Sequence, residues 1–256
     1  MDCLLALSIG ILSGALLGAF GGGAGLIAAP GLTVALGLSA VDATSASLIA
    51  VLVGACVGAL TGGWTGSVRL SWAVGFSVVG LLGATAGSLV SPLLSARATW
   101  ASLAGVCATT VILVSRDRRS ARSPESGIGA ITTAPSPHLA LIAGLSIGVA
   151  TGMLGIGGGV FVVPALVAFA GLSLEHATAT SLLVIAATSS AALVVRQHAV
   201  DSPPSDILFS LALGTAIAVP VGWTLASRLK VRVRWALQRD LIATMGVVCL
   251  ILAVAS

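Results

Sequence analysis

The chain has 256 residues, of which 57% are hydrophobic and only 8% are charged. A soluble domain has about 25% charged residues, so this chain has too few of them to cover the surface of a soluble protein. The composition excludes a cytosolic enzyme, a disordered tail and a secreted disulfide scaffold, and it predicts an all-α, polytopic membrane protein. The basic residues behind the net charge of +4 are confined to short loops, which is typical of membrane orientation signals and does not predict nucleic-acid binding.

Apolar segments that predict membrane helices follow one another along the chain. A helix needs about 20 residues to cross the hydrocarbon core, and most of these segments provide that length. The segments 26–38 and 160–172 are too short, and each follows a cluster of glycines. About eight transmembrane segments are predicted from the apolar stretches at about 4–20, 26–38, 43–61, 71–94, 98–115, 138–154, 160–172, 177–195, 205–226 and 240–255.

The polar stretch from Ser115 to Pro137 separates two halves that repeat each other. Residues Gly10–Leu48 align without a gap with Gly144–Leu182, a shift of 134 residues, and most of the identical positions are glycine, proline, serine or threonine. We therefore predict an internal duplication. It consists of an N-terminal transmembrane repeat at 1–115, a basic cytoplasmic linker at 116–137 and a C-terminal transmembrane repeat at 138–256.

The distribution of basic residues predicts how the repeats are oriented. If the stretches 4–38 and 138–172 each crossed the membrane once, the basic residues would divide equally between the two sides, against the positive-inside rule. If each stretch enters the membrane and returns to the same face, only Arg97 and Arg196 of the 12 basic residues lie outside. We therefore expect broken hairpins, three spanning helices per repeat, inverted repeats and external termini in a multi-pass protein of the cell membrane. Such repeats are typical of secondary transporters.

The two glycine clusters carry the predicted site. Glycine at this density disfavours a continuous helix, and broken backbone at membrane depth occurs only where it lines a cavity or is buried in protein. A short helix is expected to begin near Leu26 and near Val160, where its unpaired N–H groups would form an anion site. No Lys or Arg lies in the apolar spans near the breaks, so we expect neutral donors to hold the anion. The predicted substrate-binding glycines are Gly21, Gly23, Gly25, Gly155, Gly157 and Gly159.

Other glycines near the clusters have a structural interpretation. A spacing of four residues is typical of helices that pack closely together. We assign that role to the glycines that precede each break, and a purely structural hairpin tip remains an alternative for the clusters themselves. The glycines with this spacing are Gly10, Gly14 and Gly18 in the first half and Gly144, Gly148 and Gly152 in the second.

Hydroxyl side chains follow each short helix and complete the predicted substrate site. Thr44 and Ser47 lie three residues apart and share one helix face, as do Thr178 and Ser181. These hydroxyls are expected either to donate to a substrate oxygen or to bond to helix backbones. Both interpretations remain open.

Residues at the segment ends have simpler interpretations. Ser39 and Ser173 are predicted to be N-caps of the helices that follow. The first turns of these helices contain Asp42 in one repeat and Glu175 and His176 in the other, where acids favour the helix dipole, and the sequence does not decide whether any of them titrates during transport. Trp100, like the other tryptophans, lies near a segment end and is predicted to be a membrane-interface anchor. We expect no catalytic residue, metal ligand or cofactor.

The doubled motif resembles that of the TauE/SafE sulfite exporter family. The likeness covers about 4–255 and implies a bacterial or archaeal inner-membrane permease with about eight helices. It also implies a substrate among sulfite, sulfoacetate and other sulfur-containing or organic anions. The first copy has Gly22 where the second has Ile156, which leaves open whether the two half-sites contribute equally. The resemblance rests on Gly14 to Pro30 and Gly148 to Pro164, followed by Ala43-Thr44…Ser47-Leu48 and Ala177-Thr178…Ser181-Leu182.

Together these patterns predict a secondary transporter that moves a small anion, such as sulfite or an organosulfonate. Its expected partners are the anion and the lipid bilayer, and a proton or sodium coupling ion remains open. An anion channel and a non-transporting membrane assembly subunit are the alternatives. An intramembrane enzyme would need a catalytic pair at depth, whereas the acidic residues here lie at segment ends or in loops.

Overall fold

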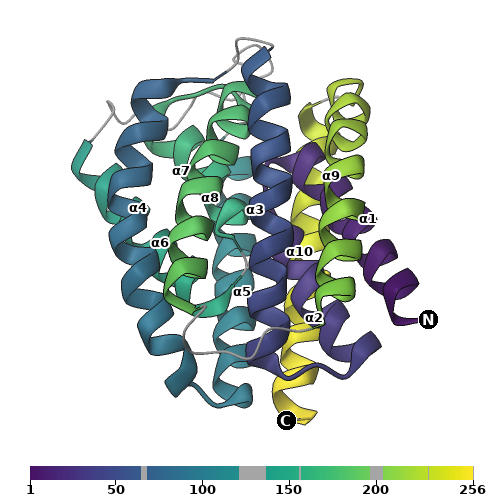
Figure 1. Cartoon of the computed structure of the whole chain (residues 1–256). Helices are drawn as coiled ribbons and strands as arrows, with labels where there is room; N and C mark the ends of the chain where they lie inside the picture. Colours follow the sequence, from purple (N-terminus) through teal and green to yellow (C-terminus); the bar gives the residue numbers. More distant parts are fainter. Residues whose placement is uncertain (65–67, 121–136, 156, 197–203, 230, 256) are drawn as a thin grey trace.

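A computed structural model describes residues 1–64, 68–120, 137–155, 157–196, 204–229 and 231–255. Six of the described helices are long and apolar enough to cross a membrane, which confirms the prediction of a polytopic all-α protein. The elements, shown in Figure 1, are α1 (Asp2–Phe20), α2 (Ala24–Leu36), α3 (Ala40–Trp64), α4 (Leu70–Val90), η1 (Ser91–Leu93), α5 (Ala96–Ser120), α6 (Pro137–Leu154), α7 (Gly159–Ala170), α8 (Leu174–Arg196), α9 (Ser205–Ser227) and α10 (Val231–Ala255).

Each repeat begins with a broken hairpin, as predicted. The arms α1 and α2 lie side by side, because a Cβ atom built on Gly31 would be 3.4 Å from Cγ2 of Ile9. In the second repeat a Cβ atom on Gly158, the N-cap of α7, would be 3.1 Å from Cγ2 of Ile147 in α6. The short helices begin at Ala24 and Gly159, slightly earlier than expected. Figure 1 shows both chain ends toward the same end of the helical bundle.

The repeats interlock through two pairs of parallel helices, each with one helix from either repeat. Helix α1 packs along α9, and α6 packs along α4. Gly14 faces the backbone of Thr215, while Gly148 faces the backbone of Gly80, so a Cβ atom at either glycine would collide with main chain. Five of the six glycines spaced four apart face main chain in this way, which confirms their structural interpretation, whereas a Cβ atom on Gly144 would lie 3.5 Å from the Phe76 ring.

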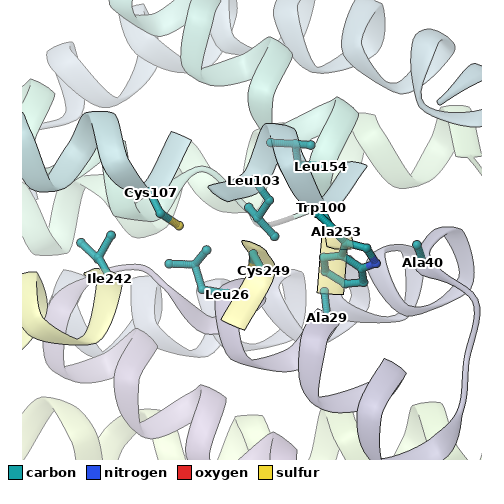
Figure 2. Packing of buried hydrophobic residues seen from close by; sticks show 10 residues of the cluster. All are labelled: Leu26, Ala29, Ala40, Trp100, Leu103, Cys107, Leu154, Ile242, Cys249 and Ala253. Carbon is teal, nitrogen blue, oxygen red and sulfur yellow. The ribbon is translucent and has the colours of Figure 1, made fainter. Parts of the chain in front are cut away.

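A hydrophobic cluster beside the first hairpin joins α2 and α6 to α5 and α10 (Figure 2). Trp100 is only 1% exposed, and its cluster includes Leu26 of α2, Leu154 of α6 and Cys249 of α10. The prediction that Trp100 anchors the chain at the membrane interface is therefore wrong. The indole fills the core because α5 places it against the short helix of the hairpin.

The predicted division into repeats and linker falls partly outside the described residues. Helix α5 continues to Ser120, so the first residues of the predicted linker 116–137 are helical. Helix α6 begins at Pro137, and residues 121–136 are not described. The boundaries of the two repeats therefore stay a prediction.

Candidate functional site

The two glycine clusters break the helices because several of their residues adopt a left-handed backbone. Gly21 and Gly155, at equivalent positions, have φ angles of 69° and 68°. Gly23 and Gly157, the next equivalent pair, have φ angles of 95° and 70°. Side chains other than glycine are strained in this region. The clusters therefore end α1 and α6 and allow the chain to turn back.

The two breaks meet inside the protein. Gly22 packs directly on the backbone of Gly159, and a Cβ atom on Gly159 would lie 2.9 Å from the carbonyl oxygen of Gly21. All three residues are buried. Because one break comes from each repeat, the starts of α2 and α7 are brought together.

Backbone donors at these helix starts are left without acceptors. The N-cap of α2 is Gly23 and that of α7 is Gly158, and no side chain forms a capping hydrogen bond at either helix start. Within the described part of the chain, no acceptor is found for the N–H groups of residues 23–25 or residues 157–159. These residues are buried. Buried N–H groups at a helix start attract an anion, because the helix dipole is positive there.

Ser47 and Ser181 tie each break to the opposite repeat. The Ser47 hydroxyl donates to the carbonyl oxygen of Gly155 at 2.6 Å, and the Ser181 hydroxyl donates to that of Gly21 at 2.9 Å. Each hydroxyl also lies 2.8 Å from the carbonyl oxygen three residues before it in its own helix. In this conformation both hydroxyl hydrogens bond to backbone, so the serines brace the breaks.

The two threonines of the predicted site lie beside these contacts. The Thr44 hydroxyl donates to the carbonyl oxygen of Val41 at 2.9 Å, and the Thr178 hydroxyl donates to that of Leu174 at 2.7 Å. Thr44 packs on Gly155, as Thr178 packs on Gly21. The structure thus brings all four hydroxyls to the breaks, although their hydrogens point to main-chain carbonyls.

The residues at the starts of α3 and α8 cap those helices. Ser39 accepts a hydrogen bond from the Asp42 N–H at 3.2 Å and donates to its carboxylate at 2.6 Å. In the second repeat Ser173 accepts from the His176 N–H at 3.4 Å, and its hydroxyl lies 2.7 Å from Nδ1 of His176. The predicted N-caps are confirmed, and Asp42 and His176 are their capping partners.

Arg196 was assigned to an external loop by the charge count, but its side chain is buried. It lies at the end of α8 and is only 2% exposed. Its Nη1 donates to Thr44 Oγ1 at 3.0 Å, and its Nη2 donates to the carbonyl oxygens of Gly152 and Met153 at 2.8 and 2.9 Å. Arg196 follows the apolar span 177–195, so its place in the sequence did not predict that its side chain reaches one of the breaks. The guanidinium caps the last carbonyls of α6, where the helix dipole favours a cation.

Arg234, near the start of α10, caps the other broken helix. Its Nη2 donates to the carbonyl oxygen of Ala19, the position equivalent to Met153. Burial lowers the pKa of Arg234, and the nearby Glu175 carboxylate opposes this shift. Each break is thus bound by one arginine, but the two arginines come from non-equivalent helices. Sequence reasoning missed both, because each residue is adjacent to a loop and nothing in its spacing shows that it turns inward.

The chain is similar to known membrane proteins. Residues 6–254 match the model of the family described as sulfite exporter TauE/SafE. A protein of Xylella fastidiosa described as a probable membrane transporter protein is 30% identical over 184 residues, which cover 71% of this chain and 69% of the relative. No solved structure matches the chain.

Proposed function

We propose that this membrane transporter, which belongs to the sulfite exporter TauE/SafE family, carries a small anion such as sulfite or an organosulfonate across the cell membrane. The anion would bind where the two broken hairpins meet. In our proposal the linker and the ends of α3 and α9 face the cytoplasm, and both termini are external. This orientation leaves Arg97 and Arg196 on the outer side, in accordance with the positive-inside rule.

The burial of unpaired N–H groups at the starts of α2 and α7 is the observation that carries this proposal. Nearly all buried N–H groups in proteins have an acceptor, and an unpaired one costs free energy. Among the described residues, none accepts from Gly23 or from Gly157. An anion that accepts several of these bonds would remove that cost, and neutral donors would still let it leave.

The division of roles follows from the contacts. Glycines at the breaks supply the donors, and Ser47 and Ser181 hold each break against the opposite repeat. Thr44 and Thr178 shape the same region. Because Gly22 and Gly159 belong to different repeats, rocking one repeat against the other would change the separation of the two breaks. Such rocking would expose the site to one side at a time.

Counterflow of labelled sulfite in proteoliposomes tests the proposal. Vesicles preloaded with unlabelled sulfite should take up the label faster than empty vesicles, because a carrier returns more quickly when it is loaded on both sides. Saturable flux without this acceleration would identify an anion channel. A complete lack of flux for sulfite, sulfonates and carboxylates would contradict the proposal.

A glycine variant locates the site within the same assay. Gly157→Leu should abolish flux, because a side chain there would meet Val51 and would block the break. Gly171→Leu is the matched control, since Gly171 has a similar φ of 64° but nothing within 4 Å of an added Cβ atom. Both variants should reach the membrane. Flux by folded Gly157→Leu at the level of the control would refute the site assignment.

A further inference from the structure

Arg196 is a buried cation with only neutral partners. Besides Thr44 and the carbonyls of α6, its Nη1 donates to Ser45 Oγ at 3.2 Å, and its Nη2 donates to Ser91 Oγ. Its Nε is buried and has no hydrogen-bond partner among the described residues. The guanidinium therefore joins α8 to α3, to η1 and to the end of α6.

No acid neutralises this charge in the described part of the chain. An ion pair is found between Arg239 and Asp240, but none involves Arg196. A buried charge without a counter-ion is costly, and the carbonyl end of α6 offsets only part of that cost. Arg234 differs, because it is half-buried and lies near Glu175. Positive charge therefore remains uncompensated at the α6 break.

The equivalent position in the first repeat lacks this charge. The shift of 134 residues, continued along α3 and α8, places Gly62 opposite Arg196 and Ala55 opposite Ser189. The Ser189 hydroxyl is buried two turns before Arg196, on the same face of α8, and it also has no partner among the described residues. The face of α8 that carries Ser189 and Arg196 is thus more polar than the equivalent face of α3. This difference between the repeats lies beside the break that contains Gly157.

We infer that Arg196 is the fixed positive charge of the anion site and sets its affinity for anions. It does so without being a ligand in this conformation, because four of its five N–H groups bond to the protein. Its charge would raise the potential at the unpaired N–H groups of Gly157–Gly159, four to six residues beyond Met153. The inference rests on the proposed function and adds a named source of charge selectivity to it.

Sulfite uptake by proteoliposomes containing Arg196→Gln tests the inference. The glutamine removes the charge but keeps a hydrogen-bond donor. The KM for sulfite should rise about tenfold, the effect of one unit charge about 10 Å from the anion at an effective dielectric constant of about 20, while Vmax changes much less. Arg97→Gln, which removes an exposed charge from the same side, should leave KM unchanged. A folded Arg196→Gln protein with the wild-type KM would overturn the inference.

Arg196→Lys distinguishes the contribution of the positive charge from that of the guanidinium hydrogen bonds. Lysine keeps the positive charge but cannot reproduce the planar set of donors. If charge is what matters, the lysine variant keeps a KM within about threefold of the wild type, and this outcome can be measured even if Arg196→Gln fails to fold. A folded lysine variant with a KM raised tenfold would overturn the inference. Failure of the wild type itself to transport any anion would instead contradict the proposed function.

Discussion

At the scale of single residues, hydrogen bonds from the Ser47 and Ser181 hydroxyls hold the broken backbone in place. Ser47→Ala would leave the buried carbonyl oxygen of Gly155 without this donor. Removing one partner of a buried hydrogen bond costs about 1–3 kcal/mol, so the variant should lower the midpoint of thermal unfolding in detergent. Ser146→Ala is the control, because that exposed hydroxyl bonds only within its own helix. Equal midpoints for the two variants would show that Ser47 does not brace the break.

The residues of the site differ in how far their roles could be predicted. Four of the six predicted break glycines have a positive φ, and the caps Ser39 and Ser173 are confirmed, because a positive φ and a capped helix start are local properties of the chain. The inward turn of Arg196 was not found, since it depends on which helices surround the end of α8. The engagement of Ser181 with Gly21, 160 residues away, likewise depends on tertiary packing.

Helix pairing is the property that matters most at the element scale. Gly14→Ala should destabilise the protein, because the new Cβ atom would meet the backbone of Thr215 and would force α1 away from α9. Gly75→Ala makes the same chemical change inside α4, with nothing within 4 Å of the added atom. That control should be neutral or should stabilise the helix by up to about 1 kcal/mol. Thermal unfolding of both variants measures the difference, and a Gly14→Ala protein as stable as Gly75→Ala would contradict this packing.

The hairpins were predicted more completely than their neighbours. Short apolar stretches after glycine clusters, together with the distribution of arginines, predicted that α1–α2 and α6–α7 turn back. The helices that pack against α1 and α6 could not be predicted. Glycines spaced four apart indicate that another helix packs closely, but they do not show which helix it is. The structure shows that each partner, α9 and α4 respectively, comes from the other repeat.

At the scale of the whole molecule, the helix pairs α1–α9 and α6–α4 join the two repeats into one unit, and the two breaks meet at its centre. Each break is braced by a serine of the opposite repeat, so neither half-site is complete alone. The duplication predicts near symmetry, and the hydrogen bonds of the two serines obey it. The arginines do not, because Arg196 and Arg234 reach the equivalent carbonyls from different helices. The protein thus combines a symmetric scaffold with an asymmetric charge.

The central claim is that an anion binds where the two broken helices meet. Selenite, the selenium analogue of sulfite, can be located by anomalous scattering in crystals of the protein. The account predicts a selenium peak at the paired breaks, with selenite oxygens about 2.7–3.2 Å from N–H groups of Gly23–Gly25 and Gly157–Gly159. Density that shows α1 continuing unbroken through Gly21–Gly23, or selenite bound only elsewhere at saturating concentration, would contradict it.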